Sequence, residues 1–268
     1  MFTRLVSADL FGIDGRTVEV EVDVQKSKLG NFVISGLPSK GIRESRERIR
    51  SAILNSGHPY PGSHRILVNL APAAWEKRGS GLDLPIALGI LVAQGTFRPV
   101  LAKGWAALGE LTPGGATRAG SGTLGLVSAL RDAGYDRVIL PAENWEEGSA
   151  VPGVTCIGVT SIDDARRYLV GEELPRPPTT AAPTRDPSSR TPLDFSEVIG
   201  HERPKRAIAL AVAGEHNLLF VGSPGAGKSL LARRIPGLLP DPTDEEILEI
   251  TKIHSAAGLK TVPGLLRC

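Results

Sequence analysis

Aromatic residues and cysteines are scarce in this sequence. Phe, Trp and Tyr make up 4% of its 268 residues, so the core must be aliphatic and stacking platforms for single-stranded nucleic acid are few. The two cysteines, Cys156 and Cys268, exclude a disulfide framework and fit a reducing cytosol. Cys156 lies in an apolar run, and we expect it to be a core residue.

Long apolar runs and a strong net charge are also missing. The longest apolar stretch, 82–93, contains Asp83 and Pro85 and is too short to span a bilayer. The N-terminus soon alternates as a strand and does not resemble a signal peptide, so we expect a cytoplasmic protein without a membrane partner. The net charge of +2 neither requires nor excludes nucleic acid, so any surface for it must be a local patch.

One stretch fits the pattern G-x-x-x-x-G-K-[ST] at every fixed position. The segment 217–221 before it indicates a short buried strand, and 230–235 after it indicates the start of a helix. Glycines let backbone N–H groups turn inward, and a helix N-terminus favours an anion. The predicted nucleotide-binding residues are Gly222, Ser223, Pro224, Gly225, Ala226, Gly227, Lys228, Ser229 and Leu230.

This pattern predicts ATP and Mg²⁺ as cofactors. Lys228 would reach the β- and γ-phosphates, and the Ser229 hydroxyl would ligate Mg²⁺. The alternative is a chance glycine turn between a strand and a helix. We favour the nucleotide site because all fixed positions and both flanking segments agree with it.

The first 170 residues predict a run of strands followed by alternating strands and helices, which is typical of an α+β or mixed α/β domain. Valines alternate with acids over 18–24, as in a strand with one buried face. The predicted strands are 18–24, 31–34, 65–70, 106–111, 137–140 and 154–159. Predicted helices begin at Ser39, near Leu82, at Leu124 and after Ser161, and the helix near Leu82 is almost wholly apolar.

The helix that begins at Ser39 carries a basic cluster opposite its apolar face. Arg43, Arg46 and Arg50 are the most prominent members. This cluster could contact the phosphates of DNA. We favour the other interpretation, a solvated helix face that carries Arg–Glu pairs.

The segment 171–193 differs in composition from both of its neighbours. It carries six prolines among Thr, Ser and Ala, so we interpret it as an extended linker without a fold of its own. It separates a domain at 1–170 from a module at 194–268. In that module we expect helices at 204–214 and 244–250.

The acidic strand that holds Mg²⁺ in P-loop enzymes is missing from the residues after Ser229. No apolar run there ends in Asp-Asp or Asp-Glu. A P-loop sheet this short cannot close its core, so the chain looks truncated relative to a working ATPase.

The sequence resembles the ComM/YifB family of magnesium chelatase-like AAA+ proteins in both halves. Matching runs in the second half are Phe195-x-x-Val198-Ile199-Gly200, Lys205-Arg206-Ala207, Gly214-x-His216-Asn217-Leu218-Leu219 and Leu231-Ala232-Arg233-Arg234. Matching runs in the first half are Ser35-Gly36-Leu37-Pro38, Asn69-Leu70-Ala71-Pro72-Ala73, Lys77-x-Gly79 and Asp83-Leu84-Pro85-Ile86-Ala87.

The resemblance implies a fold and a function. It implies a ribosomal-S5-like, Lon-protease-like domain followed by an incomplete P-loop AAA+ domain, in which Ile199 and Gly200 line the adenine pocket. Complete members are expected to be bacterial cytosolic homo-hexamers, ATP-driven motors that migrate DNA branches in natural transformation. His201 departs from the family, which has Gln or Glu there.

Two other hypotheses stay open at this point. The first is a Ser–Lys peptidase, disfavoured because matching to the Lon motif puts Gly81 at the nucleophile, with Ser80 one place early, and Leu124 at the catalytic lysine. The second is a non-enzymatic scaffold with a nucleotide-binding stub. Because the acidic strand, sensor residues, arginine finger and lid are missing, we expect this chain alone to hydrolyse ATP poorly even if it binds ATP.

Overall fold

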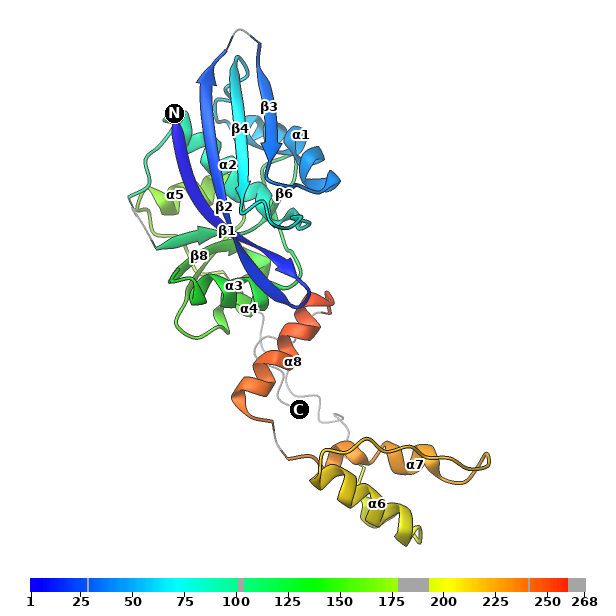
Figure 1. Cartoon of the computed structure of the whole chain (residues 1–268). Coiled ribbons are helices and arrows are strands. Elements are labelled where there is room, and N and C mark those ends of the chain that lie inside the picture. The colour runs from blue at the N-terminus through cyan, green and yellow to red at the C-terminus, as the bar shows by residue number, and fades with distance from the viewer. Residues whose placement is uncertain (28, 101–103, 178–192, 241, 260–268) are drawn as a thin grey trace. The chain divides into compact units, whose positions relative to one another are not determined.

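The computed structural model describes residues 1–27, 29–100, 104–177, 193–240 and 242–259 (Figure 1). The described residues before 178, together with those from Glu246 onward, form the first compact unit, and residues from 193 to Glu245 form the second. No helix among the described residues is long and apolar enough to cross a membrane.

A four-stranded sheet in the order β1-β2-β4-β3 forms the centre of the first unit. Its strands are β1 (Phe2–Phe11), β2 (Asp14–Lys26), β4 (His64–Ala71) and β3 (Asn31–Ser35), and only β3 and β4 run parallel. The alternating valines of β2 are buried, which confirms the strand predicted over 18–24. Sequence analysis did not identify β1, which pairs with β2 along its whole length.

Two of the helices that pack against this sheet contribute to its aliphatic core (Figure 1). The helix α1 (Lys40–Asn55) begins after Ser39, whose side chain accepts from the amide of Ile42 and so caps the helix as predicted. The helix α2 (Asp83–Ala93) is buried except for Val92. Together they supply much of the aliphatic core that the scarcity of aromatic residues requires.

A parallel sheet in the order β5-β8-β9 forms the rest of this unit. It consists of β5 (Trp105–Ala107), β8 (Arg137–Pro141) and β9 (Thr155–Val159). Between β5 and β8 in the sequence, β6 (Glu110–Leu111) and β7 (Thr117–Arg118) form a small antiparallel pair.

The single strand predicted over 106–111 is wrong, because the chain is divided at Gly109. This residue has φ 152°, its amide donates to the carbonyl of Gly81, and its carbonyl accepts from the amide of Leu84. The amide and carbonyl of Gly109 therefore bind residues at the start of α2 and are not available to pair with a neighbouring strand.

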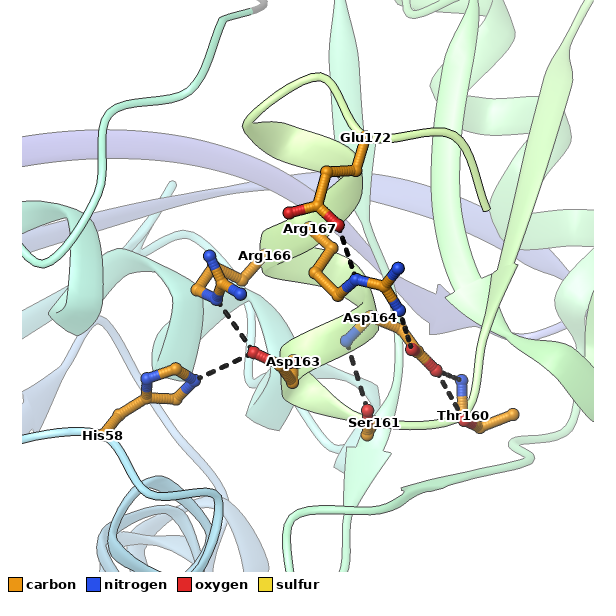
Figure 2. Close-up of polar contacts among 8 residues, drawn as sticks. All are labelled: His58, Thr160, Ser161, Asp163, Asp164, Arg166, Arg167 and Glu172. Atoms are coloured by element: carbon orange, nitrogen blue, oxygen red, sulfur yellow. Dashed lines mark hydrogen bonds and ion pairs between the residues drawn. The ribbon is translucent and has the colours of Figure 1, made fainter. Parts of the chain in front are cut away.

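Three helices complete this part of the unit: α3 (Thr123–Asp132), α4 (Trp145–Ser149) and α5 (Ile162–Leu169). Figure 2 shows the polar contacts that fix α5. The Ser161 side chain accepts from the amide of Asp164, and the Asp164 carboxylate accepts from the amide of Thr160 at 3.0 Å. Further along the helix, Arg166 donates to Asp163 at 2.9 Å. The cap predicted at Ser161 is therefore confirmed.

Only the first part of the predicted linker belongs to the described residues. Residues 172–177 contain no helix or strand, and Leu174 packs against the main core. The remainder of the linker prediction, 178–192, lies outside the described residues, as does Cys268. Cys156 is buried as predicted, and burial raises the pKa of its thiol to about 12.

The second unit contains α6 (Glu202–Ala213) and α7 (Lys228–Ala232), around a small cluster of Val198, Ile208 and Leu231. The predicted helix at 244–250 is present as the longer α8 (Asp244–Ala256). From Glu246 onward α8 belongs to the first unit, where the Ser255 carbonyl accepts from the amide of Gly122 at 2.9 Å.

Candidate nucleotide-binding site

The loop that ends at Ser229 enters α7 through two glycines with positive φ. Gly225 has φ 82° and Gly227 has φ 75°, a backbone region in which a residue with a Cβ is strained. Gly227 is the N-cap residue of α7. The first amides of a helix have no acceptor within it, so this turn presents backbone donors at the entrance to α7.

Lys228 folds back over the loop that precedes it. Its Nζ donates to the carbonyl of Gly222 at 2.8 Å and to that of Ser223 at 2.7 Å. The amide of Ala226 donates to the same Ser223 carbonyl at 3.3 Å, which closes the turn. An ammonium held beside a loop of backbone amides suits an anion, so these residues fit the triphosphate that the sequence predicts.

The other residues of the predicted site are accessible to solvent. Ser229 and Leu230 are exposed, whereas Leu231 is buried and anchors α7 in the small core. Gly222, Ser223, Pro224, Gly225 and Ala226 are also exposed. Within the described ranges no group of three or more His, Cys, Asp or Glu could hold a metal ion, so Mg²⁺ enters the hypothesis through Ser229 and the phosphates of ATP.

The turn at Gly200 lies against the phosphate loop. Gly200 has φ 75°, and a Cβ built on Gly227 would lie 3.3 Å from Nε2 of His201. Ile199 is 95% exposed. The structure therefore brings the Gly200–His201 turn to the loop but leaves the predicted adenine-pocket side chain in solvent.

The segment 217–221 is not a strand, and the expectation of a buried strand before the loop is wrong. Leu219 is 84% exposed and Val221 is 87% exposed, and neither belongs to a strand. An extended segment is stabilised by pairing with a neighbour, and no strand of the second unit is described beside it.

Arg234, part of a run that matches the family, has a structural role that sequence reasoning did not assign. It is 7% exposed, and its guanidinium donates to the carbonyl of Asp194 at 2.8 Å, to the carbonyl of Leu230 at 3.0 Å and to the Glu197 carboxylate at 2.7 Å. It thereby ties the start of the module to the end of α7. Nothing in the local pattern distinguishes it from the exposed Arg233 beside it.

Lys77 lies shortly before Gly81, the residue matched to the Lon nucleophile, and it serves as a structural group. Lys77 is fully buried, and its Nζ donates to the carbonyls of Gly36 and Pro72. Burial lowers the pKa of Lys77 and raises that of Asp9. The Asp9 carboxylate, also missed by sequence reasoning, accepts from the amides of Arg78 and Gly79 at 2.7 and 2.8 Å.

These features describe an α/β protein whose glycine-rich loop opens onto a helix. Residues 20–144 match the sequence model of a family described as "Subunit ChlI of Mg-chelatase", and residues 194–268 match the model described as "Magnesium chelatase, subunit ChlI". The chain belongs to the ComM/YifB family of magnesium chelatase-like proteins.

Individual relatives agree with this assignment over nearly the whole chain. Identity is 36% to an uncharacterized protein of Mycobacterium tuberculosis, over 96% of this chain and 50% of that protein. It is also 36% to YifB of Escherichia coli, over 94% and 48%, and to the competence protein ComM of Haemophilus influenzae, over 91% and 48%. The chain spans about half the length of these curated relatives.

A shorter match concerns a protease. A putative lon protease homolog of Methanothermobacter thermautotrophicus is 47% identical over 61 residues, which is 23% of this chain and 11% of that protein.

Proposed function

We propose that this chain binds ATP with Mg²⁺ through the loop from Gly222 to Ser229, and that in the complete protein this binding drives a DNA-processing motor. The position of Lys228 carries the proposal, because its ammonium is held at the loop by the carbonyls of Gly222 and Ser223. When bound, ATP would supply the phosphoanhydride bond whose cleavage drives movement. Ile199 and Gly200 would contact the adenine, and Leu230 would line the site.

The DNA-processing part rests on the family. One relative is named a competence protein, and the resemblance implies branch migration of DNA by a cytoplasmic homo-hexamer. We propose the same role for a protein of the length of these relatives, about half of which this chain spans.

We also propose a domain assignment. Residues 1–170 would form a non-proteolytic domain similar to Lon protease, 171–193 the linker, and 194–268 the first part of an AAA+ domain. The first assignment rests on the resemblance to the family, whose first domain is similar to Lon protease. The structural use of Lys77 and the burial of Leu124 support a domain without a Ser–Lys dyad, because nucleophile and base must lie within hydrogen-bond reach.

The test of this proposal is the affinity of the chain for a fluorescent ATP analogue with Mg²⁺. Changing Lys228→Ala removes a charged donor to the phosphates, a contact of about 1.5–3 kcal/mol, so the dissociation constant should rise about 10- to 150-fold. Lys40→Ala is the matched control, because Lys40 is an exposed lysine of α1, and it should bind like the wild type.

The second variant separates phosphate from metal binding. Ser229→Ala should weaken binding only when Mg²⁺ is present, because the hydroxyl is proposed to contact the ion. Equal binding by the wild type and by Lys228→Ala would contradict the site. Absence of binding in the wild type would favour the scaffold with a stub.

ATP hydrolysis by this chain alone should be slow even though ATP binds. An arginine finger contributes about 10³–10⁵ in rate, and neither such a residue nor an acidic strand was identified after Ser229. Phosphate release by purified chain, compared with that of Lys228→Ala, measures this. A turnover rate typical of complete motors would contradict the prediction.

A further inference from the structure

Three hollows share lining residues at one end of the four-stranded sheet, where β2 ends and β3 and β4 begin. This end of the sheet is at the top of Figure 1. The largest measures about 850 Å³ and the smallest about 270 Å³, and His64 lines all three. Tyr60 is shared by two of them. We call these three neighbouring hollows together the His64 groove.

The charged side chains that line the His64 groove are mostly basic. Arg46 and Arg50 of α1 and Lys26 of β2 line it, against a single acid, Glu47. The acids that alternate with the valines of β2, Glu19 and Glu21 among them, lie on the opposite face of that strand. The groove is therefore a local basic patch although the net charge of the chain is only +2.

Two arginines of the groove are positioned without being neutralised. Arg46 donates through Nε to the carbonyl of Arg43 and through Nη1 to the carbonyl of Phe32, both at 2.9 Å. Arg50 lies over the ring of Tyr60, 5.7 Å from its centre. The Arg–Glu pairs predicted for this helix face are not among the ion pairs of the described residues, where α1 contributes Lys40–Glu44 and Arg48–Asp83.

Beside apolar residues such as Phe32, Ile66 and Val24, the groove contains further hydrogen-bonding side chains, among them His64 and Tyr60. Nδ1 of His64 is buried and has no hydrogen-bond partner within the described part of the chain. The hydroxyl of Tyr60 is a donor at neutral pH, and burial raises its pKa further, to about 12. Guanidinium groups bind phosphate with a matching fork of donors, and an aromatic wall suits a base.

We propose that the His64 groove binds the phosphate backbone of single-stranded DNA, with Arg46 and Arg50 as its phosphate contacts. The proposal deepens the proposed function, since it gives the DNA partner a surface on the first unit. Three neighbouring hollows with basic side chains in each suit a chain of phosphates better than one small anion. Of the three arginines that sequence analysis singled out, Arg43 is not proposed to contact DNA, because it does not line the groove.

The test is the fluorescence anisotropy of a labelled oligothymidine titrated with the full chain. The variant Arg46→Glu/Arg50→Glu should bind at least about tenfold more weakly, and the slope of log affinity against log salt should fall by about two. Arg65→Glu is the matched control, because Arg65 is exposed and points away from the buried neighbour Ile66. It should change affinity less than about twofold at physiological salt. Glu47→Gln should tighten binding.

A milder pair protects the test against misfolding. Arg46→Gln/Arg50→Gln keeps a donor at each position and should also weaken binding, with an unchanged circular dichroism spectrum. Equal losses in Arg65→Glu and in the double variant would overturn the proposal, as would undiminished binding by the double variant. Displacement of the oligonucleotide by inorganic phosphate at equal phosphate concentration would also overturn it in favour of a small-anion site.

Failure of this proposal is distinguishable from failure of the nucleotide site. Lys228→Ala should lose the ATP analogue but retain oligothymidine, whereas Arg46→Glu/Arg50→Glu should show the reverse. Loss of oligothymidine in Lys228→Ala would place the DNA contact in the second unit and overturn the groove.

Discussion

Replacing Arg48 with methionine is expected to lower the free energy of unfolding of the first unit by about 3–5 kcal/mol. Arg48 donates through Nε to the Asp83 carboxylate at 2.7 Å, and the Asp83 side chain is only 3% exposed. Removing the guanidinium leaves a buried carboxylate whose remaining donor is the amide of Leu111, at 3.2 Å. An uncompensated buried charge is among the costliest defects that a single substitution produces.

Denaturant unfolding followed by tryptophan fluorescence measures this loss selectively, because Trp75, Trp105 and Trp145 all belong to the first unit. Arg43→Met is the matched control, an exposed arginine of the same helix, and should change stability by less than about 0.5 kcal/mol. The double variant Arg48→Met/Asp83→Leu should recover most of the loss, since an apolar pair replaces an ion pair. A double variant as unstable as Arg48→Met would contradict the charge argument.

The pH dependence provides a second readout of the same pair. Burial raises the pKa of Asp83 above its ordinary value of 3.8, and Arg48 opposes this rise. Between the ordinary pKa of Asp83 and its raised pKa in the native state, the native state binds more protons than the unfolded state. The free energy of unfolding therefore falls as pH rises through this range. Methionine at position 48 removes the opposing effect, so the destabilisation should be larger at about pH 7 than at about pH 4.

Changing Gly36 to alanine is expected to destabilise the first unit by about 3 kcal/mol or more. Gly36 has φ 89°, and a Cβ on it would lie 2.1 Å from the carbonyl oxygen of Leu70. Because this oxygen belongs to the backbone of β4, the clash cannot be relieved by a side-chain rotation. A shift of the backbone would also disturb the carbonyl of Gly36, which accepts from Nζ of Lys77 at 2.9 Å.

Gly57→Ala is the control that separates the steric clash of a Cβ from the strain of a positive φ. Gly57 also has positive φ, at 76°, but a Cβ there would meet nothing within 4 Å. Gly57→Ala should therefore cost only about 1 kcal/mol. Equal effects of the two substitutions on the unfolding midpoint would show that φ alone requires glycine at position 36.

The sequence predicted elements whose signals are local. Alternating valines identified β2, and Ser39 and Ser161 identified the starts of α1 and α5, because alternation and capping involve residues a few positions apart. β1 was missed because its burial pattern depends on pairing with β2. The segment 217–221 was overpredicted because an apolar run indicates burial only when a partner strand is present.

The candidate site shows the same division. Fixed spacing identified the loop and Lys228, whereas the structural roles of Arg234 and Asp9 gave no signal. Arg234 reaches residues 37 and 40 positions away, and Asp9 reaches residues 69 and 70 positions away. A buried charge is selected by such distant partners, which a single sequence does not reveal. The basic cluster of α1 was visible, but only the structure separated Arg46 and Arg50 from Arg43.

The exposed segment before the phosphate loop has a consequence for the lifetime of the chain in a cell. The second unit encloses Val198, Ile208 and Leu231 in its only described core, while Leu219 and Val221 remain in solvent. An exposed segment that belongs to no helix or strand is accessible to the active-site cleft of a protease, and its cleavage requires no global unfolding. Any polypeptide that paired with 217–221 as a neighbouring strand would bury this cleavage site. We therefore expect assembly and resistance to degradation to be coupled, so that unassembled chains are removed first.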